Sequence, residues 1–497
     1  MMLNFCQYRI YPLFFTSLLI LLSNLSYAQL PAESLVSTID NALNSRCLDE
    51  SQTATSIVSL PSGRSIYSHN ALQPLLPASV MKIITTAAAL HYLGPEYRFK
   101  TVFMHTGQRQ GDVIHGDLII RGGGDPRLST EQFWRIATQI KASGINEFTG
   151  DLIVDAHFFD TYDRAPAWEV ERTQQAYDAK LGALSLNFNT ISVHLQPGNQ
   201  IGDMIRTWLE PATPYIQLQN TAKTIQRGKT TVSAYRSPEE TLGQVYLYVR
   251  GRLPVSSQEK VIRLNIDNPI RYAAETFKAI LQQAGVKIAG VTKISYNPVV
   301  GQELYYHLSD PLSLILKELN TFSNNFTAEQ ILKTIAAEQA GTPGSHENGL
   351  RLVEDFLHLS HVNTQGVILR DASGLSRANR MTTQAITDVL SSMYSRFDVG
   401  PDFVTALRVM GAAGVLSQRL AKSPARGQIR AKTGTLYRVS TLAGYVATPH
   451  GKVFAYAIFL NNNGCGPWRA DRIEDRIVNA IHELGDNTIE YTASIAQ

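Results

Sequence analysis

The sequence of 497 residues predicts an α+β protein whose main domain is an antiparallel sheet flanked by helices. Strand and helix patterns occur near both ends of the chain, so we expect one domain to be assembled from both ends. Between them the residue pattern changes to short strands interrupted by Gly, Pro and Asn, which indicates a large β-rich insertion. A chain of this length exceeds what one hydrophobic core usually organises, so several domains are expected.

The composition is that of an ordinary globular protein and excludes several classes. Hydrophobic residues make up 44% and charged residues 18%, and the formal net charge is +3. This weak charge gives no nucleic-acid or polybasic membrane signal, so we expect no nucleic-acid partner and at most peripheral membrane association. No cofactor and no metal site are predicted, because His346-Glu347 lacks the second His of a zinc-binding helix.

The first 28 residues differ from the rest and predict a signal peptide. After Arg9 an apolar run covers residues 13–22, and the small-residue site Ser26-Tyr27-Ala28 follows it. The run is short for a bilayer span, but a single Arg makes a poor n-region, so an uncleaved anchor is the alternative. The mature protein is therefore expected in the periplasm or the extracellular space.

Two cysteines, Cys47 and Cys465, remain in the mature chain, one near each end. An even pair in an oxidising compartment can form a disulfide, and two free thiols explain the pattern equally well. The residues by themselves leave both alternatives open.

A helix that follows Pro77 carries the first candidate pair. Apolar residues recur at helical spacing over residues 80–90, and Gly94 ends the pattern. Ser79 and Lys82 are three residues apart on one face, where an amine can reach a hydroxyl. The helix N-terminus favours an alkoxide or oxyanion beside it. Alone, such a pair is more often merely solvated than catalytic.

The β-rich stretch is expected to form one or two accessory modules. Strand formers cluster between turn signals at residues 100–104, 116–120, 150–154, 191–195 and 244–249. An insertion of this size is tolerated where the ends of a surface loop lie close together.

Helical patterns return after the insertion, and the second candidate pair, Ser323 and Asn325, lies among them. An apolar face at residues 312–319 marks one helix, and another begins near Ala328. Ser323 and Asn325 lie on the short connection, with side chains free to point into a cleft. Such a pair alone is more often a helix N-cap.

The third candidate motif is Lys432-Thr433-Gly434, followed by Thr435, on a predicted strand near the C-terminus. Residues 442–447 and 453–460 follow as a β-hairpin, and a helix closes the chain. A lysine on a strand edge is by itself as often merely solvated. A Lys-Thr-Gly triplet is expected only about 0.1 times by chance in such a chain, so coincidence with the other two motifs is improbable.

The three motifs together resemble the active-site signature of the serine penicillin-binding proteins and β-lactamases. The long gap between Ser79 and Ser323 exceeds what a compact β-lactamase needs. It is similar to the penicillin-binding protein 4 family of D-alanyl-D-alanine carboxypeptidases/endopeptidases, the class C low-molecular-mass penicillin-binding proteins. Residues 370–377 also resemble that family's loop, with Ala372 where Gly is more usual, and Asn324 replaces a common Asp.

The resemblance implies a transpeptidase-like catalytic domain interrupted after its nucleophile helix. We expect a signal peptide at residues 1–28, the catalytic domain at 29–95 and 266–497, and the insertion at 96–265.

It also implies a role for each motif. Ser79 is the expected nucleophile and Lys82 its base, which must be neutral to act. Burial and the second cation, Lys432, are expected to lower the pKa of Lys82. Ser323 would relay the proton to the leaving D-alanine, and Asn325 would hold the substrate amide.

Substrate-binding residues follow from the same resemblance. Lys432 and the hydroxyls of Thr433 and Thr435, in the triplet that Gly434 completes, would bind a terminal carboxylate. The backbone N–H groups of Ser79 and Thr435 are the expected oxyanion hole. Arg377 is predicted to bind the side chain of a stem peptide, and a structural salt bridge is its alternative role.

The implied function is a serine DD-peptidase that acts on peptidoglycan stem peptides. It would hydrolyse the terminal D-Ala-D-Ala bond, and also D-Ala cross-bridges, through an acyl-enzyme on Ser79. β-Lactam antibiotics are expected as covalent inhibitors. A serine β-lactamase or esterase and a catalytically silent wall-binding protein are the alternatives, and the existence of a homodimer stays open.

Overall fold

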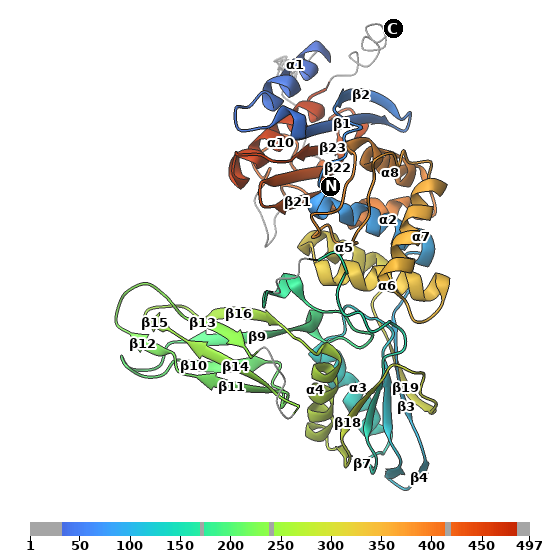
Figure 1. Ribbon diagram of the computed structural model, residues 1–497, viewed down its shortest axis with the longest axis vertical. Helices are drawn as coiled ribbons and strands as arrows, with labels where there is room; N and C mark the ends of the chain where they lie inside the picture. Colours follow the sequence, from blue (N-terminus) through green and yellow to red (C-terminus); the bar gives the residue numbers. More distant parts are fainter. Residues whose placement is uncertain (1–31, 169–172, 238–242, 413–418, 485–497) are drawn as a thin grey trace, which may run out of the picture.

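The computed structural model describes residues 32–168, 173–237, 243–412 and 419–484. A main body holds both ends of the described chain, and two β-rich lobes extend from its other side (Figure 1). The predicted signal peptide lies outside the described residues. Within the four described ranges, no helix is both long and apolar enough to cross a membrane.

The main body is built on a six-stranded sheet whose strands come from both ends of the chain. Their order is β2-β1-β23-β22-β21-β20. Neighbouring strands pair antiparallel, and β1 pairs with β23 from Thr53↔Leu460 to Leu60↔Val453. The strands are β1 (Thr53–Leu60), β2 (Arg64–His69), β20 (Arg408–Val409), β21 (Ile429–Leu436), β22 (Val439–Ala447) and β23 (Val453–Leu460). The predicted α+β class is confirmed.

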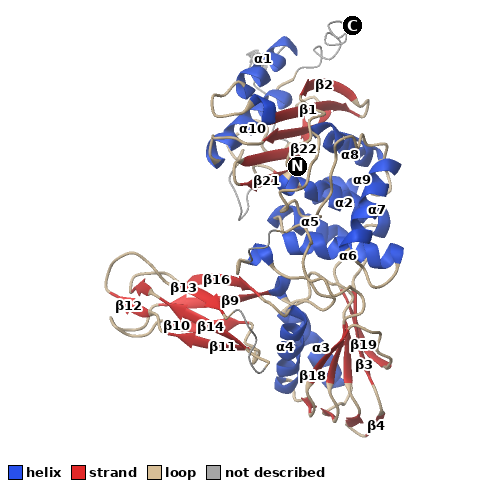
Figure 2. Ribbon diagram, viewed as in Figure 1, coloured by secondary structure: helices blue, strands red, loops and turns tan. Residues whose placement is uncertain are grey.

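Helices cover both faces of this sheet (Figure 2). On one face, α1 (Ala32–Leu43) and α10 (Pro467–His482) pack together over a cluster that includes Ile39, Ile458 and Ile477. The other face is covered by a larger group of helices with its own cluster. That group consists of α2 (Met81–Leu93), α5 (Leu312–Phe322), α6 (Asn325–Ala340), α7 (His346–Leu359), α8 (Thr383–Ser395) and α9 (Gly400–Ala406).

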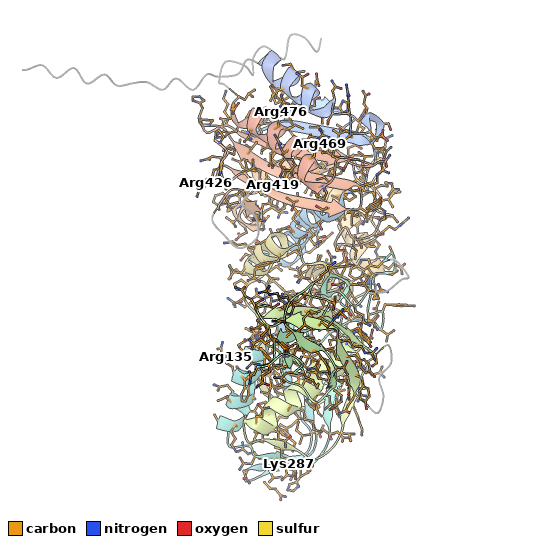
Figure 3. All side chains as sticks on the ribbon, turned by 90° about the vertical axis from the view of Figure 1, so that its left-hand side faces the viewer. Arg135, Lys287, Arg419, Arg426, Arg469 and Arg476 are labelled. Carbon is orange, nitrogen blue, oxygen red and sulfur yellow. A yellow bond between two sulfur atoms is a disulfide. The ribbon has the colours of Figure 1, made fainter. Side chains whose placement is uncertain are left out.

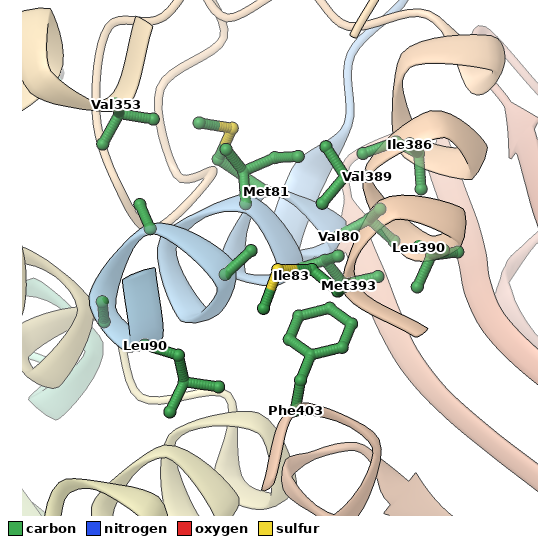
Figure 4. Packing of buried hydrophobic residues seen from close by; sticks show 14 of the residues in the cluster. Val80, Met81, Ile83, Leu90, Val353, Ile386, Val389, Leu390, Met393 and Phe403 are labelled. Carbon is green, nitrogen blue, oxygen red and sulfur yellow. The ribbon is translucent and has the colours of Figure 1, made fainter. Parts of the chain in front are cut away.

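The helix α2 lies inside the main body, with neighbours on all sides. Every residue from Met81 to Leu90 is buried, including the polar Lys82, Thr85 and Thr86. It ends at Gly94, which adopts a positive φ of 76°, at the position predicted from the sequence. Figure 4 shows its packing against residues of α7, α8 and α9, namely Val353, Ile386, Val389, Leu390, Met393 and Phe403.

A disulfide joins Cys47 to Cys465 and so connects the two ends of the main body. Cys47 follows α1, and Cys465 immediately precedes α10. Of the two alternatives that the sequence leaves open, the structure therefore contains the disulfide.

The insertion begins with a lobe of two sheets and two helices, α3 (Thr130–Ala142) and α4 (Pro269–Gln283). One sheet has the order β18-β8-β6-β3-β19 and consists of β3 (Lys100–His105), β6 (Leu118–Arg121), β8 (Leu152–Asp155), β18 (Thr292–Ser295) and β19 (Gln302–Leu308). The other has the order β17-β7-β5-β4 and consists of β4 (Gln108–Gln110), β5 (Val113–His115), β7 (Glu147–Phe148) and β17 (Lys287–Ile288).

The second lobe is an arm of small sheets that extends to the left in Figure 1. Two three-stranded sheets, β10-β9-β16 and β11-β14-β13, and the pair β12-β15 form it. Its strands are β9 (Thr190–Gln196), β10 (Arg206–Glu210), β11 (Ile216–Asn220), β12 (Lys223–Ile225), β13 (Ser233–Arg236), β14 (Val245–Arg250), β15 (Arg252–Pro254) and β16 (Lys260–Asn265).

The packing of the insertion corrects the boundary expected at residue 265. The helix α4 follows that residue, yet Phe277 packs against Phe103 and Phe133 of the insertion. Further on, β19 pairs antiparallel with β3, with Leu308 opposite Lys100. The last strand of the insertion therefore ends near residue 308, because α4 buries its apolar face in this core and not in the main body.

One helix inside the insertion was not predicted. The stretch was expected to consist of strands, but α3 forms there and is amphipathic, with Phe133 and Ile136 among its buried residues. A capping box starts this helix, because Ser129 and Gln132 each bond to the other's backbone N–H. The Ser-x-x-Gln spacing is the sequence signal that predicts such a start.

Candidate active site

Ser79 lies in a tight turn, η2 (Ala78–Val80), which leads directly into α2. Two glycines allow other elements to approach this turn closely. A methyl group on Gly434 of β21 would lie 2.8 Å from the backbone nitrogen of Ser79. A methyl group on Gly374, where φ is +80°, would lie 1.7 Å from the carbonyl oxygen of Ala78. The turn is therefore held between the sheet and the loop of residues 371–377.

The amine of Lys82 points from the first turn of α2 to three oxygen atoms. Its Nζ lies 3.2 Å from Oγ of Ser79, 2.8 Å from Oδ1 of Asn325 and 2.6 Å from the carbonyl oxygen of Ser373. The side chain is fully buried. Burial disfavours the charged amine and lowers the pKa of Lys82 to about 8, and the carboxyl groups of Asp371 and Glu329 oppose this shift.

The second lysine, Lys432 on β21, is also buried and reaches the other serine. Its Nζ donates to Oγ of Ser323 at 2.9 Å and to its neighbour's carbonyl oxygen, that of Thr433, at 2.7 Å. Burial, followed by the positive charges of Lys82 and Arg408, holds the pKa of Lys432 well below its usual value.

The direction of the shift at Lys82 agrees with the expectation. Burial is the largest cause at both lysines, as predicted. The two amines repel each other when both are charged, so the positive charge of Lys82 adds to burial in lowering the pKa of Lys432. Lys82 has Asp371 and Glu329 nearby, and these carboxyl groups raise its pKa.

Ser323 and Asn325 occupy the junction between α5 and α6, as the sequence predicts. Ser323 ends α5 with a left-handed φ of 56°, which turns the chain sharply. Asn324 then caps α6 by accepting a hydrogen bond from the N–H of Thr327 at 3.0 Å. The three residues therefore divide the roles: Asn324 caps the helix, while Ser323 and Asn325 face the two lysines.

The amide of Asn325 also contacts the insertion. Its Nδ2 donates to the carbonyl oxygen of Tyr177 at 3.2 Å, within the turn η3 (Ala176–Asp178). A second link is the indole N–H of Trp168, which donates to Asp371 at 3.1 Å. The insertion therefore reaches the edge of the site, which the sequence did not indicate.

The strand β21 leaves part of its outer edge open beside these groups. Its short neighbour β20 pairs only with Arg430 and Ala431. Beyond Ala431, no strand of the described chain pairs with this edge, and Thr433 is half-buried while Thr435 is exposed. Free backbone groups and two hydroxyls therefore lie next to Lys432, where an extended ligand can add to the sheet.

Arg377 lies apart from the two lysines. Its guanidinium contacts the carbonyl oxygen of Tyr437 at 3.4 Å and lines a pocket of about 290 Å³ together with Arg380 and Arg438. Arg377 forms no ion pair with a carboxylate of the described residues, so the alternative of a structural salt bridge has no support there.

Two buried carboxyl groups near Lys82 were missed. Asp371 accepts the N–H groups of Gly374 and Ser376, each at 2.7 Å. Glu329 accepts the N–H of Ser373 at 2.9 Å. An acidic residue on the apolar helix α6, four residues after Asn325, was the signal that could have identified Glu329.

Metal ligands do not gather anywhere in the described chain, which contains no group of three or more His, Cys, Asp or Glu side chains that could hold an ion. The site instead consists of two serine hydroxyls, two buried lysine amines and an open strand edge. Together with an antiparallel sheet covered by helices, this set defines a serine hydrolase with the penicillin-binding-protein fold.

Comparison with known proteins specifies the family. Residues 35–484 match the D-Ala-D-Ala carboxypeptidase 3 (S13) family, and the chain belongs to it. It is 33% identical over 445 residues to a D-alanyl-D-alanine carboxypeptidase of Actinomadura sp. (strain R39), which covers 86% of this chain and 81% of the relative. The protein is accordingly a serine-type D-Ala-D-Ala carboxypeptidase.

Two further similarities come from Haemophilus influenzae. The D-alanyl-D-alanine carboxypeptidase DacB is 25% identical over 449 residues, which are 86% of this chain and 88% of that protein. The crystal structure of penicillin binding protein 4 (dacB) shares the fold, with a TM-score of 0.77 at 23% identity over 89% of this chain and 99% of that one. These matches confirm the predicted family and fold.

Proposed function

We propose that this carboxypeptidase removes the terminal D-alanine of peptidoglycan stem peptides through an acyl-enzyme on Ser79. One observation carries the proposal: Nζ of Lys82 lies 3.2 Å from Oγ of Ser79, and burial lowers the pKa of that amine to about 8. At neutral pH a useful fraction of such an amine is uncharged and able to accept a proton.

The acylation step uses both serines. Neutral Lys82 takes the proton of Ser79 as Oγ attacks the carbonyl carbon of the penultimate D-alanine. The bond from that carbon to the terminal nitrogen then breaks. The proton that Lys82 accepted passes through the hydroxyl of Ser323 to the leaving D-alanine nitrogen, which returns Lys82 to its neutral form; Lys432 contacts Ser323 at 2.9 Å. Water hydrolyses the ester, which returns the hydroxyl of Ser79 and releases the shortened peptide.

The open edge of β21 is the proposed binding strip for the substrate. Lys432 and the hydroxyls of Thr433 and Thr435 bind the terminal carboxylate, as a cation beside hydrogen-bond donors suits. The N–H groups of Ser79 and Thr435 stabilise the oxyanion. The side-chain oxygen of Asn325 accepts from Lys82, and its Nδ2 donates to the carbonyl oxygen of Tyr177. A substrate amide would replace Tyr177 as the partner of Nδ2.

The same site is proposed to react with β-lactams and to cleave cross-bridges. One H. influenzae structure of penicillin binding protein 4 is described as a complex with a novel β-lactam, and that fold resembles this one. A strip open to solvent accepts a longer, branched peptide as well as a short one, so endopeptidase cleavage of D-Ala cross-bridges is included. The predicted signal peptide and the disulfide both support a periplasmic or extracellular location.

Mass spectrometry after incubation with labelled penicillin tests the proposal. We expect one adduct on the wild type, located on Ser79, and none on Ser79→Ala. The wild type should also release D-alanine from a pentapeptide that ends in D-Ala-D-Ala. An adduct that survives Ser79→Ala would contradict the acyl-enzyme, and an adduct lost within seconds would favour β-lactamase action.

A further inference from the structure

The loop of residues 371–376 connects a buried carboxylate to the amine of Lys82. Glu329 on α6 is 0% exposed, and its Oε1 accepts the N–H groups of Ala372 at 3.1 Å and of Ser373 at 2.9 Å. The carbonyl oxygen of Ser373 in turn accepts a hydrogen bond from Nζ of Lys82 at 2.6 Å. Ser373 therefore connects the two side chains: its N–H donates to Glu329, and its carbonyl oxygen accepts from Lys82.

Asp371, the first residue of this loop, bonds to its later residues. This carboxylate accepts the N–H groups of Gly374 and Ser376, each at 2.7 Å, and the indole N–H of Trp168 at 3.1 Å. Gly374 packs against the turn that carries Ser79. Because both ends of the loop are bonded to buried carboxylates, it presents a rigid carbonyl oxygen to the amine.

Two residues of the same helix, α6, contribute to the surroundings of the Lys82 amine. Asn325 and Glu329 are four residues apart and lie on one face of the helix. Asn325 contacts the amine of Lys82 directly at 2.8 Å, and Glu329 contacts it through the loop. One helix therefore fixes two of the three oxygen atoms around this amine.

We propose that Glu329 is a positioning residue: it holds the Ser373 carbonyl oxygen against the Lys82 amine and so sets where that amine meets Ser79. Full burial keeps Glu329 itself away from any substrate. The inference rests on the proposed role of Lys82 as the base. It predicts a loss of chemistry, and not only of stability, when the carboxylate is replaced.

The charges around Glu329 determine the sign of a second effect. Lys82 on α2, Asp371 in the loop and His346 on α7, whose Nε2 lies 3.4 Å from Oε2 of Glu329, face this carboxylate. Lys432 is the further cation beside Lys82. The negative charge of Glu329 raises the pKa of Lys82, so its removal lowers that pKa and leaves more of the amine neutral at a given pH.

The test measures acylation by labelled penicillin from about pH 5 to pH 10, normalised to titrated active sites. In Glu329→Gln, an NH₂ group replaces Oε2, which lies 3.2 Å from the backbone nitrogen of Ala372, so two donors face each other and the loop loosens. We expect the rate at the high-pH plateau to fall by about 10²-fold, as misplacement of a catalytic group does. The acid limb should move to lower pH. Glu329→Asp keeps the charge on a shorter arm and should lower the plateau without moving the limb.

Glu474→Gln is the matched control, because Glu474 is an equally buried carboxylate of the main body. It accepts hydrogen bonds from Ser440 and Arg419, each at 2.8 Å, on the sheet face opposite to α2. This variant should lose thermal stability and keep both plateau and acid limb.

A Glu329→Gln enzyme with the plateau and limb of the wild type would overturn the inference. A lower plateau with an unmoved acid limb in Glu329→Gln would also overturn it, because loss of the negative charge should lower the pKa of Lys82. A wild type that fails to react at all would instead refute the proposed function.

Discussion

The active site and the insertion differ in the partners of their buried charged groups. In the insertion, the fully buried Asp155 lies between Arg121 at 2.8 Å and the imidazole of His157 at 2.6 Å. In the active site, Lys82 and Lys432 donate only to neutral oxygens of side chains and backbone in the described chain. A charged partner opposes the effect of burial on the pKa of a group, and within the described chain neither active-site amine donates to a carboxylate. The proposed role of Lys82 depends on this difference, because an amine must be neutral to accept a proton.

The largest expected effect compares two buried lysines of the main body that differ in their hydrogen-bond partners. Lys82→Met should reduce acylation by about 10²–10⁴-fold, since it removes a general base. Lys333→Met removes a lysine of equal burial that is paired with Asp160 at 2.7 Å, and it should lower thermal stability while the rate per folded enzyme stays near wild type. Stopped-flow acylation and thermal melts of both variants check this. Equal losses of rate would break the comparison.

The next prediction concerns how each region is closed. Replacing both cysteines, as Cys47→Ser with Cys465→Ser, should lower the free energy of unfolding of the main body by about 2–5 kcal/mol. The insertion core lies between residues 103 and 288 and contains no disulfide in the described chain, so its own unfolding should not change. Calorimetry with hydrogen exchange separates the two regions. Equal destabilisation of both would show that they unfold as one unit.

A pair of glycines sharpens the comparison further. Gly434→Ala places a methyl group 2.3 Å from Oγ1 of Thr441 and 2.8 Å from the nitrogen of Ser79, so β21 must shift. We expect acylation to slow by about 10²-fold. The matched variant Gly290→Ala meets Asp151 of the insertion at 2.2 Å and should affect only stability. Values of kcat/KM, calculated with the concentration of titrated active sites, distinguish a loss of rate from a loss of folded enzyme.

The smallest expected effect is at Arg377. Its exposed guanidinium is screened by water, so Arg377→Ala should raise KM for a peptide with an anionic side chain by about two- to fivefold and leave kcat unchanged. Arg469→Ala, an exposed arginine on α10 (Figure 3), is the control and should change neither value. An unchanged KM in Arg377→Ala would contradict the predicted contact between this residue and the side chain of a stem peptide.

Much of the fold and site was predictable because the signals are local. Helical spacing and the Gly94 stop located α2, and the junction of two helices located Ser323 and Asn325. The boundary at residue 265 was wrong because α4 has the same amphipathic pattern whichever core it joins. Periodicity reports that a face is apolar, and it does not report which partner covers that face.

The sequence by itself therefore determined the three motifs, their secondary structure and the α+β class, since each depends on neighbouring residues. Only the tertiary structure decided which groups surround Lys82. Glu329, the carbonyl of Ser373 and Tyr177 of the insertion meet there through packing of elements far apart in the chain. The pKa of a buried amine depends on those neighbours and on exclusion of water, and neither is written in the spacing of a motif.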